Sequence, residues 1–168
     1  LQNGETVGSV IIDYGPGGQA NSSAGTYSGS VNPSGATGGT FDPDNYSITY
    51  NSGDIIVGKA ALTITANNDT KVYGDAQTFA GTEFVATGLK NSDGIDLVTL
   101  TSAGALKSAP ANNYTIIPSA PVASQGTDLS NYTVQFISGT DAVGQALLTI
   151  TADNQSMSYG SQLPALTL

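Results

Sequence analysis

The sequence contains no cysteine, histidine, tryptophan or arginine. Without histidine or cysteine, the usual nucleophile–base pairs and triads of hydrolytic enzymes cannot be assembled. The only two glutamates are Glu5 and Glu83. Both lie on strand-like or turn-like stretches, whereas a glycosidase needs two carboxyl groups on opposite sides of a cleft. We therefore expect this protein not to be an enzyme.

Charged residues are also scarce, and most of them are acidic. They make up 10% of the chain, against about 25% in an average soluble domain. Four scattered lysines are outnumbered by thirteen acidic residues, which gives a formal net charge of -9. This balance excludes the basic surface that nucleic-acid binding requires. No run of 18 apolar residues and no basic amphipathic stretch is present, so we expect no direct membrane insertion.

The chain repeats itself at a long interval. Residues 45–74 and 131–160 are identical at 15 of 30 positions, without gaps, at an offset of 86 positions. Offsets of 87 and 88 align earlier parts of the two copies, which places small insertions in the loops. The pattern predicts the C-terminal part of a first repeat at 1–61, a complete repeat at 62–147 and the start of a further repeat at 148–168. We expect the chain to be a window from a longer array.

Within each repeat, apolar and polar residues alternate with a period of two, which predicts strands rather than helices. Alternating runs occupy residues 46–50, 62–66, 98–101 and 132–136. They are rich in Thr, Val, Ile and Tyr, the residue types that favour strands. The predicted fold class is therefore mostly β, with tandem modules of about 86 residues in an elongated array. The modules are expected to be β-sandwich-like or β-grasp-like, and both alternatives stay open.

Three stretches carry more specific expectations. Residues 88–96, echoed by residues 1–7, predict a short helical turn or a structured loop. Residues 14–40 are dense in glycine and serine, which predicts a long mobile loop or an irregular insertion. The strand expected at 60–66 lies where one repeat meets the next, so we expect it to pair with strands of both.

Several of these segments resemble the MBG domain of the YGX type. The similar segments are Leu-Thr-Ile-Thr-Ala at 62–66 and 148–152, Gly-Leu-Lys-Asn at 88–91 and Asn-Tyr-Thr-Val at 131–134. The two matches to the YGX signature itself are Tyr73-Gly74-Asp75 and Tyr159-Gly160. Members of the family occur in tandem in very large bacterial surface proteins, including haemagglutinin-like adhesins. The resemblance therefore implies a secreted, cell-surface segment with a structural role in cell adhesion, and it carries over no catalytic residue.

Oxygen-rich turns are the only candidate metal-binding features. Ca²⁺ prefers carboxylate, amide and carbonyl oxygens, and turns that contain Asp42 and Asp44 or Asp93 and Asp96 supply them. None of these turns matches a known calcium loop, and Asp also favours turns by bonding its own backbone. No cofactor is therefore expected, and Ca²⁺ is the ion to test.

Two functions of different kinds fit these observations. In the first, the repeats form a stalk, spacer or extracellular filament, and units join by strand addition, which completes open sheet edges. The partners would then be neighbouring repeats of the same protein or other copies in a fibre. In the second, loops bind a carbohydrate or a host or matrix protein, and repetition provides avidity. Tyr14 and Tyr27 are the candidate contact residues for that alternative.

Overall fold

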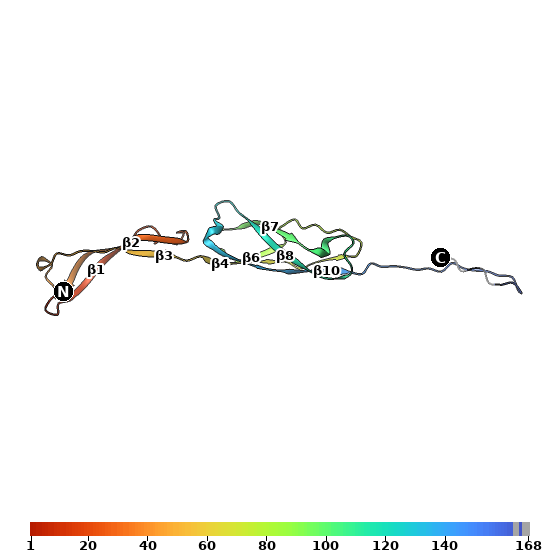
Figure 1. The fold of residues 1–168 in the computed structure, drawn as a ribbon, viewed down its shortest axis with the longest axis horizontal. Coiled ribbons are helices and arrows are strands. Elements are labelled where there is room, and N and C mark those ends of the chain that lie inside the picture. The colour runs from red at the N-terminus through yellow and green to blue at the C-terminus, as the bar shows by residue number, and fades with distance from the viewer. Residues whose placement is uncertain (163–164, 166–168) are drawn as a thin grey trace.

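The structure is a computed structural model that describes residues 1–162 and 165. The described residues form ten β-strands and three 3-10 helices of three residues each, which confirms a mostly β fold. Figure 1 shows three parts arranged lengthwise. We call them the N-terminal unit (residues 1–57), the central module (residues 60–144) and the tail (residues 145–162).

The central module is a sandwich of two β-sheets. One sheet has the strand order β5-β10-β8-β7, and the other has the order β6-β4-β9. The buried core residues come from both sheets, so the module has the sandwich-like arrangement of the two alternatives. The strands are β4 (Ala60–Ala66), β5 (Asp69–Val72), β6 (Phe84–Thr87), β7 (Ile95–Thr101), β8 (Asn112–Ala123), β9 (Tyr132–Ile137) and β10 (Gly139–Gly144).

The core of the module lies between the two sheets, and β4 supplies its centre. Leu62, Ile64 and Ala66 alternate along β4 with two threonines, so the period of two turns these three side chains inward. β4 pairs antiparallel with β6 and parallel with β9. Both partners belong to the same module, so the expectation that this strand pairs with two repeats is wrong. The buried core residues are Leu62, Ile64, Ala66, Val98, Leu100, Ile116 and Tyr132.

The N-terminal unit is a single three-stranded antiparallel sheet. Its strands are β1 (Val7–Tyr14), β2 (Gly25–Gly39) and β3 (Gly53–Val57), in that order across the sheet. At offsets of 86 to 88 they align with β7, β8 and β10 of the module. The unit therefore has the same strands as three quarters of the larger sheet of the module.

Two predictions for the N-terminal unit are wrong. Residues 14–40 are not mainly a loop, because fifteen of them form β2. Glycines with positive φ, such as Gly29 at 66° and Gly35 at 57°, allow this strand to bend, and its register with β3 shifts between Tyr27 and Val31. Residues 46–50, predicted as a strand, are not part of any strand. The equivalent β9 is held by β4, and within residues 1–162 nothing pairs with 46–50 in the same way.

The turn predicted at 88–96 is a structured loop. The Asp93 N–H donates to the Lys90 carbonyl at 3.0 Å, and Asn91 adopts the left-handed conformation with φ of 53°. The corresponding turn at the start of the chain has the same feature, with φ of 50° at Asn3. Asparagine tolerates this conformation better than most residues do, which explains why it occupies both positions.

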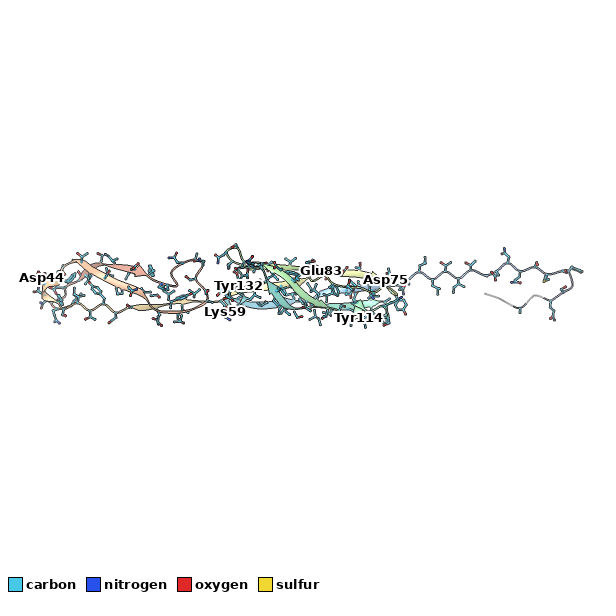
Figure 2. All side chains as sticks on the ribbon, turned by 90° about the horizontal axis from the view of Figure 1, so that it is seen from above. Asp44, Lys59, Asp75, Glu83, Tyr114 and Tyr132 are labelled. Carbon is cyan, nitrogen blue, oxygen red and sulfur yellow. The ribbon has the colours of Figure 1, made fainter. Side chains whose placement is uncertain are left out.

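The three parts of the chain are joined by very short links. Only Gly58 and Lys59 separate β3 from β4, and Figure 2 shows Lys59 at this joint. The Ala24 N–H donates to Asn131 Oδ1 at 2.8 Å and ties the N-terminal unit to the module. At the other end, the tail leaves β10 as an extended chain (Figure 1). Residues 163, 164 and 166–168 of the repeat predicted at 148–168 lie outside the described residues.

Glu83 organises the turn that precedes β6. Its Oε1 accepts a hydrogen bond from the Ala80 N–H at 2.9 Å, and its Oε2 accepts from the N–H groups of Gly81 at 2.8 Å and Thr82 at 3.0 Å. These bonds, the one from Ala80 first, lower the pKa of the Glu83 carboxyl below its ordinary value. A charged acceptor is needed here because three donors converge on one side chain.

We expect Glu83→Gln to lower the free energy of unfolding at pH 7 by about 1 kcal/mol, an estimate that allows for solvent screening of a half-buried group. Because the folded-state pKa is lowered, the stabilisation is present above the unfolded-state pKa and is lost as the pH falls through the folded-state value. Urea unfolding between pH 3 and pH 7 measures this. The two proteins should converge in acid, and a constant difference across the whole range would contradict the assignment.

Candidate assembly interface

A tyrosine hydroxyl holds an equivalent loop in each unit. In the module, the Lys90 N–H donates to the Tyr132 hydroxyl at 2.9 Å, and that hydroxyl donates to the Asp93 carboxylate. Burial, and then the bond to Asp93, raise the pKa of Tyr132 above its ordinary value. The hydroxyl is therefore a donor at any physiological pH, which fixes the direction of the hydrogen bond.

The N-terminal unit contains the same arrangement. The Gln2 N–H donates to the Tyr46 hydroxyl at 2.9 Å, and that hydroxyl donates to the Glu5 carboxylate. The bond to Glu5 is the main cause that raises the pKa of Tyr46. Gln2 and Glu5 lie 88 positions before Lys90 and Asp93, and Tyr46 lies 86 positions before Tyr132. The two units thus share a contact of three residues. Comparison of the repeats identifies the two tyrosines as equivalent, but the acid differs, since it is Glu5 in one unit and Asp93 in the other.

Two further contacts occur in both units. The Tyr27 hydroxyl donates to the Ser23 carbonyl at 2.8 Å, and the Tyr114 hydroxyl donates to the Pro110 carbonyl at 2.9 Å. The Tyr27 hydroxyl is therefore already used in a contact within its own unit, and Tyr27 is a weaker candidate for binding a ligand. Asp42 and Asp128 also cap two equivalent 3-10 helices, Pro43–Asn45 and Leu129–Asn131. The third 3-10 helix, Ala103–Ala105, is capped by Ser102.

The N-terminal unit differs from the module in the coverage of its apolar face. Val10 aligns with Val98, yet Val10 is 45% exposed and Val98 only 1%. In the module, β4 lies across this position, whereas in the N-terminal unit no described strand does so. A groove of about 190 Å³ opens on this face, and Tyr46 and Ile48 are among its lining residues, with Leu1, Val7, Ala36, Phe41 and Ser47. Among the described residues, no second sheet covers this face.

The tail repeats the core residues of β4. Leu148 and Ile150 lie 86 positions after Leu62 and Ile64. Leu62 and Ile64 are completely buried, but Leu148 is 80% exposed and Ile150 is 74% exposed. Residues 146–152 are extended and belong to no strand. Residues 146–152 therefore repeat the sequence of β4, and no described strand pairs with them.

The signature residues form a tight turn that follows the strand next to β10. The Asp75 N–H donates to the Val72 carbonyl at 3.1 Å, and Gly74 has φ of 100°, as the third residue of a type II turn requires. The tail has the same turn, in which the Ser161 N–H donates to the Ser158 carbonyl at 3.0 Å and Gly160 has φ of 83°. Tyr73 and Tyr159, which precede these glycines, are exposed. The turn therefore forms without the sheet.

The predicted calcium ligands do not come together at one place. The Asp42 side chain accepts from the Asp44 N–H at 3.1 Å and caps a 3-10 helix, while Asp44 lies at the far end of the N-terminal unit (Figure 2). Asp93 accepts from Tyr132, and Asp96 accepts from the Ser124 hydroxyl. Within residues 1–162 no three His, Cys, Asp or Glu side chains are grouped for a metal ion. These acids cap and close turns.

One buried acid was not predicted from the sequence. Asp141 of β10 is completely buried, and neither carboxylate oxygen has a hydrogen-bond partner among the described residues. The backbone of Gly104 covers it so closely that a Cβ at that position would lie 2.5 Å from Asp141 Oδ2. Nothing in the local pattern singles out this residue, because its counterpart 86 positions earlier is Ile55.

Comparison with known proteins gives one match. The sequence model of a family described as MBG domain (YGX type) matches residues 62–140. The match begins within β4 and ends within β10, so it covers nearly the whole sandwich. No curated protein and no solved structure matches the chain.

Proposed function

We propose, from the premise that residues 62–140 form an MBG domain of the YGX type, that this chain is a structural segment of a bacterial extracellular stalk, fibre or adhesin. In this proposal its units join end to end by strand addition, and it catalyses no reaction. Its partners are units of the same kind, either in the same protein or in another copy.

The exposed apolar face of the N-terminal unit is the observation that carries this proposal. Val10 lies on a sheet face that the matching part of the module keeps covered, and Ile48 in the segment 46–50 is also exposed. Exposed apolar patches bordered by polar residues mark sites of association. Open strand edges next to such a patch add unpaired backbone N–H and C=O groups, which another strand can satisfy.

The shape and composition support an extracellular stalk. The three parts follow each other lengthwise (Figure 1), as in a spacer that holds another domain away from a surface. The surface is acidic and free of cysteine, which suits an oxidising exterior where stray thiols would mispair. None of the helices in residues 1–162 is long and apolar enough to cross a membrane.

Light scattering coupled to size exclusion, over a wide range of protein concentration, tests this function. We expect the mean mass to rise with concentration and negative-stain images to show rods that lengthen in parallel. A monomer of constant mass, with no rods at any concentration, would contradict assembly. It would leave a passive spacer, and the loops around Tyr14 would then be tested against carbohydrate arrays for the binding alternative.

A further inference from the structure

We propose that the buried carboxylate of Asp141 belongs to a calcium-binding site between β5 and β10, with Asp69 and Gln77 as the other side-chain ligands. This inference goes beyond the proposed assembly and does not depend on it, because all three residues lie inside the central module. The site is separate from the turns at Asp42 and Asp93, where the sequence pattern places candidate ligands for Ca²⁺.

Three buried oxygens in this region have no hydrogen-bond partner among the described residues. They are both carboxylate oxygens of Asp141 and the amide Oε1 of Gln77. All three are acceptors, so none of them can satisfy another. Burial without a partner is costly for each of them. A single proton would serve one oxygen, whereas a cation binds several oxygens at once, so one Ca²⁺ ion would offset the cost for the whole set.

The strand register brings the two acids together. β5 and β10 run parallel, and Asp141 lies directly opposite Asp69. Residues opposite each other on neighbouring strands are about 4.8 Å apart and point to the same side of the sheet. That side is the core, because alternate residues of β10, among them Asp141, are buried. The two carboxyl groups are therefore neighbours, and a cation between them would offset their mutual repulsion.

Two contacts place Gln77 beside this pair of acids. Its Nε2 donates to the Asp69 carboxylate at 2.5 Å, which orients the amide so that Oε1 is the atom left without a partner. Its backbone N–H donates to the Ala105 carbonyl at 3.0 Å. Ala105 belongs to the 3-10 helix whose Gly104 covers Asp141. The side chain of Gln77 thus lies in the same region as both carboxyl groups.

An open hollow at the surface gives an ion access to this region. It is lined by Asp69, Thr70, Lys71, Val72, Asp75, Ala76 and Gln77. The Lys71 ammonium is already engaged, because its Nζ donates to the carbonyls of Asp75 and Leu106. Ca²⁺ takes about six to eight oxygen ligands. Two carboxylates and one amide supply part of this number, and water from the hollow would supply the rest.

The N-terminal unit shows that the fold itself does not require an acid at this position. The counterpart of Asp141 in that unit is Ile55. Ile55 of β3 lies opposite Tyr27 of β2. Asp141 of β10 lies opposite Tyr114 of β8 in the same way. One position in the fold therefore holds an apolar side chain in one unit and a carboxylate in the other, which favours a role for Asp141 that is particular to the module.

Thermal unfolding of the dilute chain tests the site, with each protein measured once in EDTA and once in Ca²⁺ at matched ionic strength. Any stability that a variant gains or loses without the ion then cancels. A Ca²⁺ concentration of about 10 mM exceeds the dissociation constants of about 0.1–1 mM that are typical of extracellular calcium modules. We expect Ca²⁺ to raise the unfolding midpoint of the module by at least about 5 °C.

Three variants identify the ligands. Asp141→Asn and Asp69→Asn should each lose most of this shift, because each removes one of the two carboxylates. Asp44→Asn is the control for net charge, since Asp44 lies at the far end of the N-terminal unit (Figure 2). It should keep the full shift.

Terbium luminescence locates the ion, because Tb³⁺ occupies calcium sites and emits when a nearby aromatic ring is excited. A Cβ added to Gly104 would lie 2.5 Å from Asp141 Oδ2 and 2.7 Å from the Tyr114 ring, so this ring is next to the carboxylate. The chain has no tryptophan, so tyrosine provides the excitation. Tyr114→Phe should lose most of the emission, and Tyr73→Phe, in the exposed signature turn, should keep it.

The outcomes separate a buried site from other effects of Ca²⁺. A shift of equal size in the unsubstituted chain and all three Asp variants would reflect general screening of an acidic protein and would overturn the site, as would no shift in any of them. A shift lost in Asp69→Asn but kept in Asp141→Asn would place the ion in the surface hollow and contradict a buried ligand. Full terbium emission from Tyr114→Phe would also contradict the position. None of these results depends on end-to-end assembly, since the dilute chain is measured.

Discussion

Replacement of Ile64 by alanine should lower the free energy of unfolding of the central module by about 3 kcal/mol. Ile64 is fully buried in β4, between β6 and β9, and its side chain faces the opposite sheet. Removal of three carbons there loses apolar burial and leaves a cavity that a strand held on both sides cannot close. Urea unfolding of the dilute monomer, followed by circular dichroism, measures the change.

Ile150→Ala is the matched control, since Ile150 occupies the same repeat position in the tail. It should leave the unfolding of the dilute monomer unchanged, because the side chain is mostly exposed there. At high concentration, however, it should weaken assembly. Equal destabilisation by the two substitutions would mean that the tail already packs within its own chain, and that would contradict its exposure.

Asp141→Asn should raise the free energy of unfolding of the module by about 2 kcal/mol. The carboxylate is fully buried without a partner among the described residues, and an uncompensated buried charge costs more than a neutral amide of the same shape. Asp75→Asn provides the control for net charge, because Asp75 is exposed in the signature turn. Thermal and urea unfolding of the three proteins at pH 7 give the comparison.

An unchanged or lower free energy of unfolding for Asp141→Asn would show that the carboxylate stabilises the folded state. Titration with Ca²⁺ would then identify the partner. Stabilisation of the unsubstituted chain by Ca²⁺, absent in Asp141→Asn, would place a cation beside β10. That site would differ from the turns at Asp42 and Asp93 that the sequence pattern indicates.

The sequence predicts strands correctly where a partner strand lies in the same unit, and it fails where no described strand pairs with the segment. The period of two at 62–66, 98–101 and 132–136 corresponds to β4, β7 and β9. The same pattern at 46–50 gives no strand, because alternation records which face is buried and does not say whether a partner strand is present. Whether a strand forms there depends on a partner strand elsewhere in the fold. The local sequence of a segment at an open sheet edge does not say whether that partner is present.

The glycine-rich stretch shows a second limit. Residues 14–40 have the composition of a linker, yet most of them form β2. This strand pairs with β1 on one side and with β3 on the other. Backbone hydrogen bonds to two neighbours outweigh the low strand propensity of glycine, and the left-handed glycines accommodate the register shifts. For the candidate interface, the offset of 86 positions identifies residues 148–152 in advance as a second copy of residues 62–66. The exposed face at Val10 is visible only in the structure.

The direction of the strands also determines how the chain bears mechanical load. The chain enters the module at the start of β4 and leaves it at the end of β10, and each of these strands runs parallel to a neighbour, β9 or β5. A pull along the long axis would draw β4 and β10 in opposite directions and slide each along its parallel partner. The ladder bonds would then be loaded in shear and break together instead of opening one by one. A segment with this geometry resists tension well, as a tether in flowing liquid must.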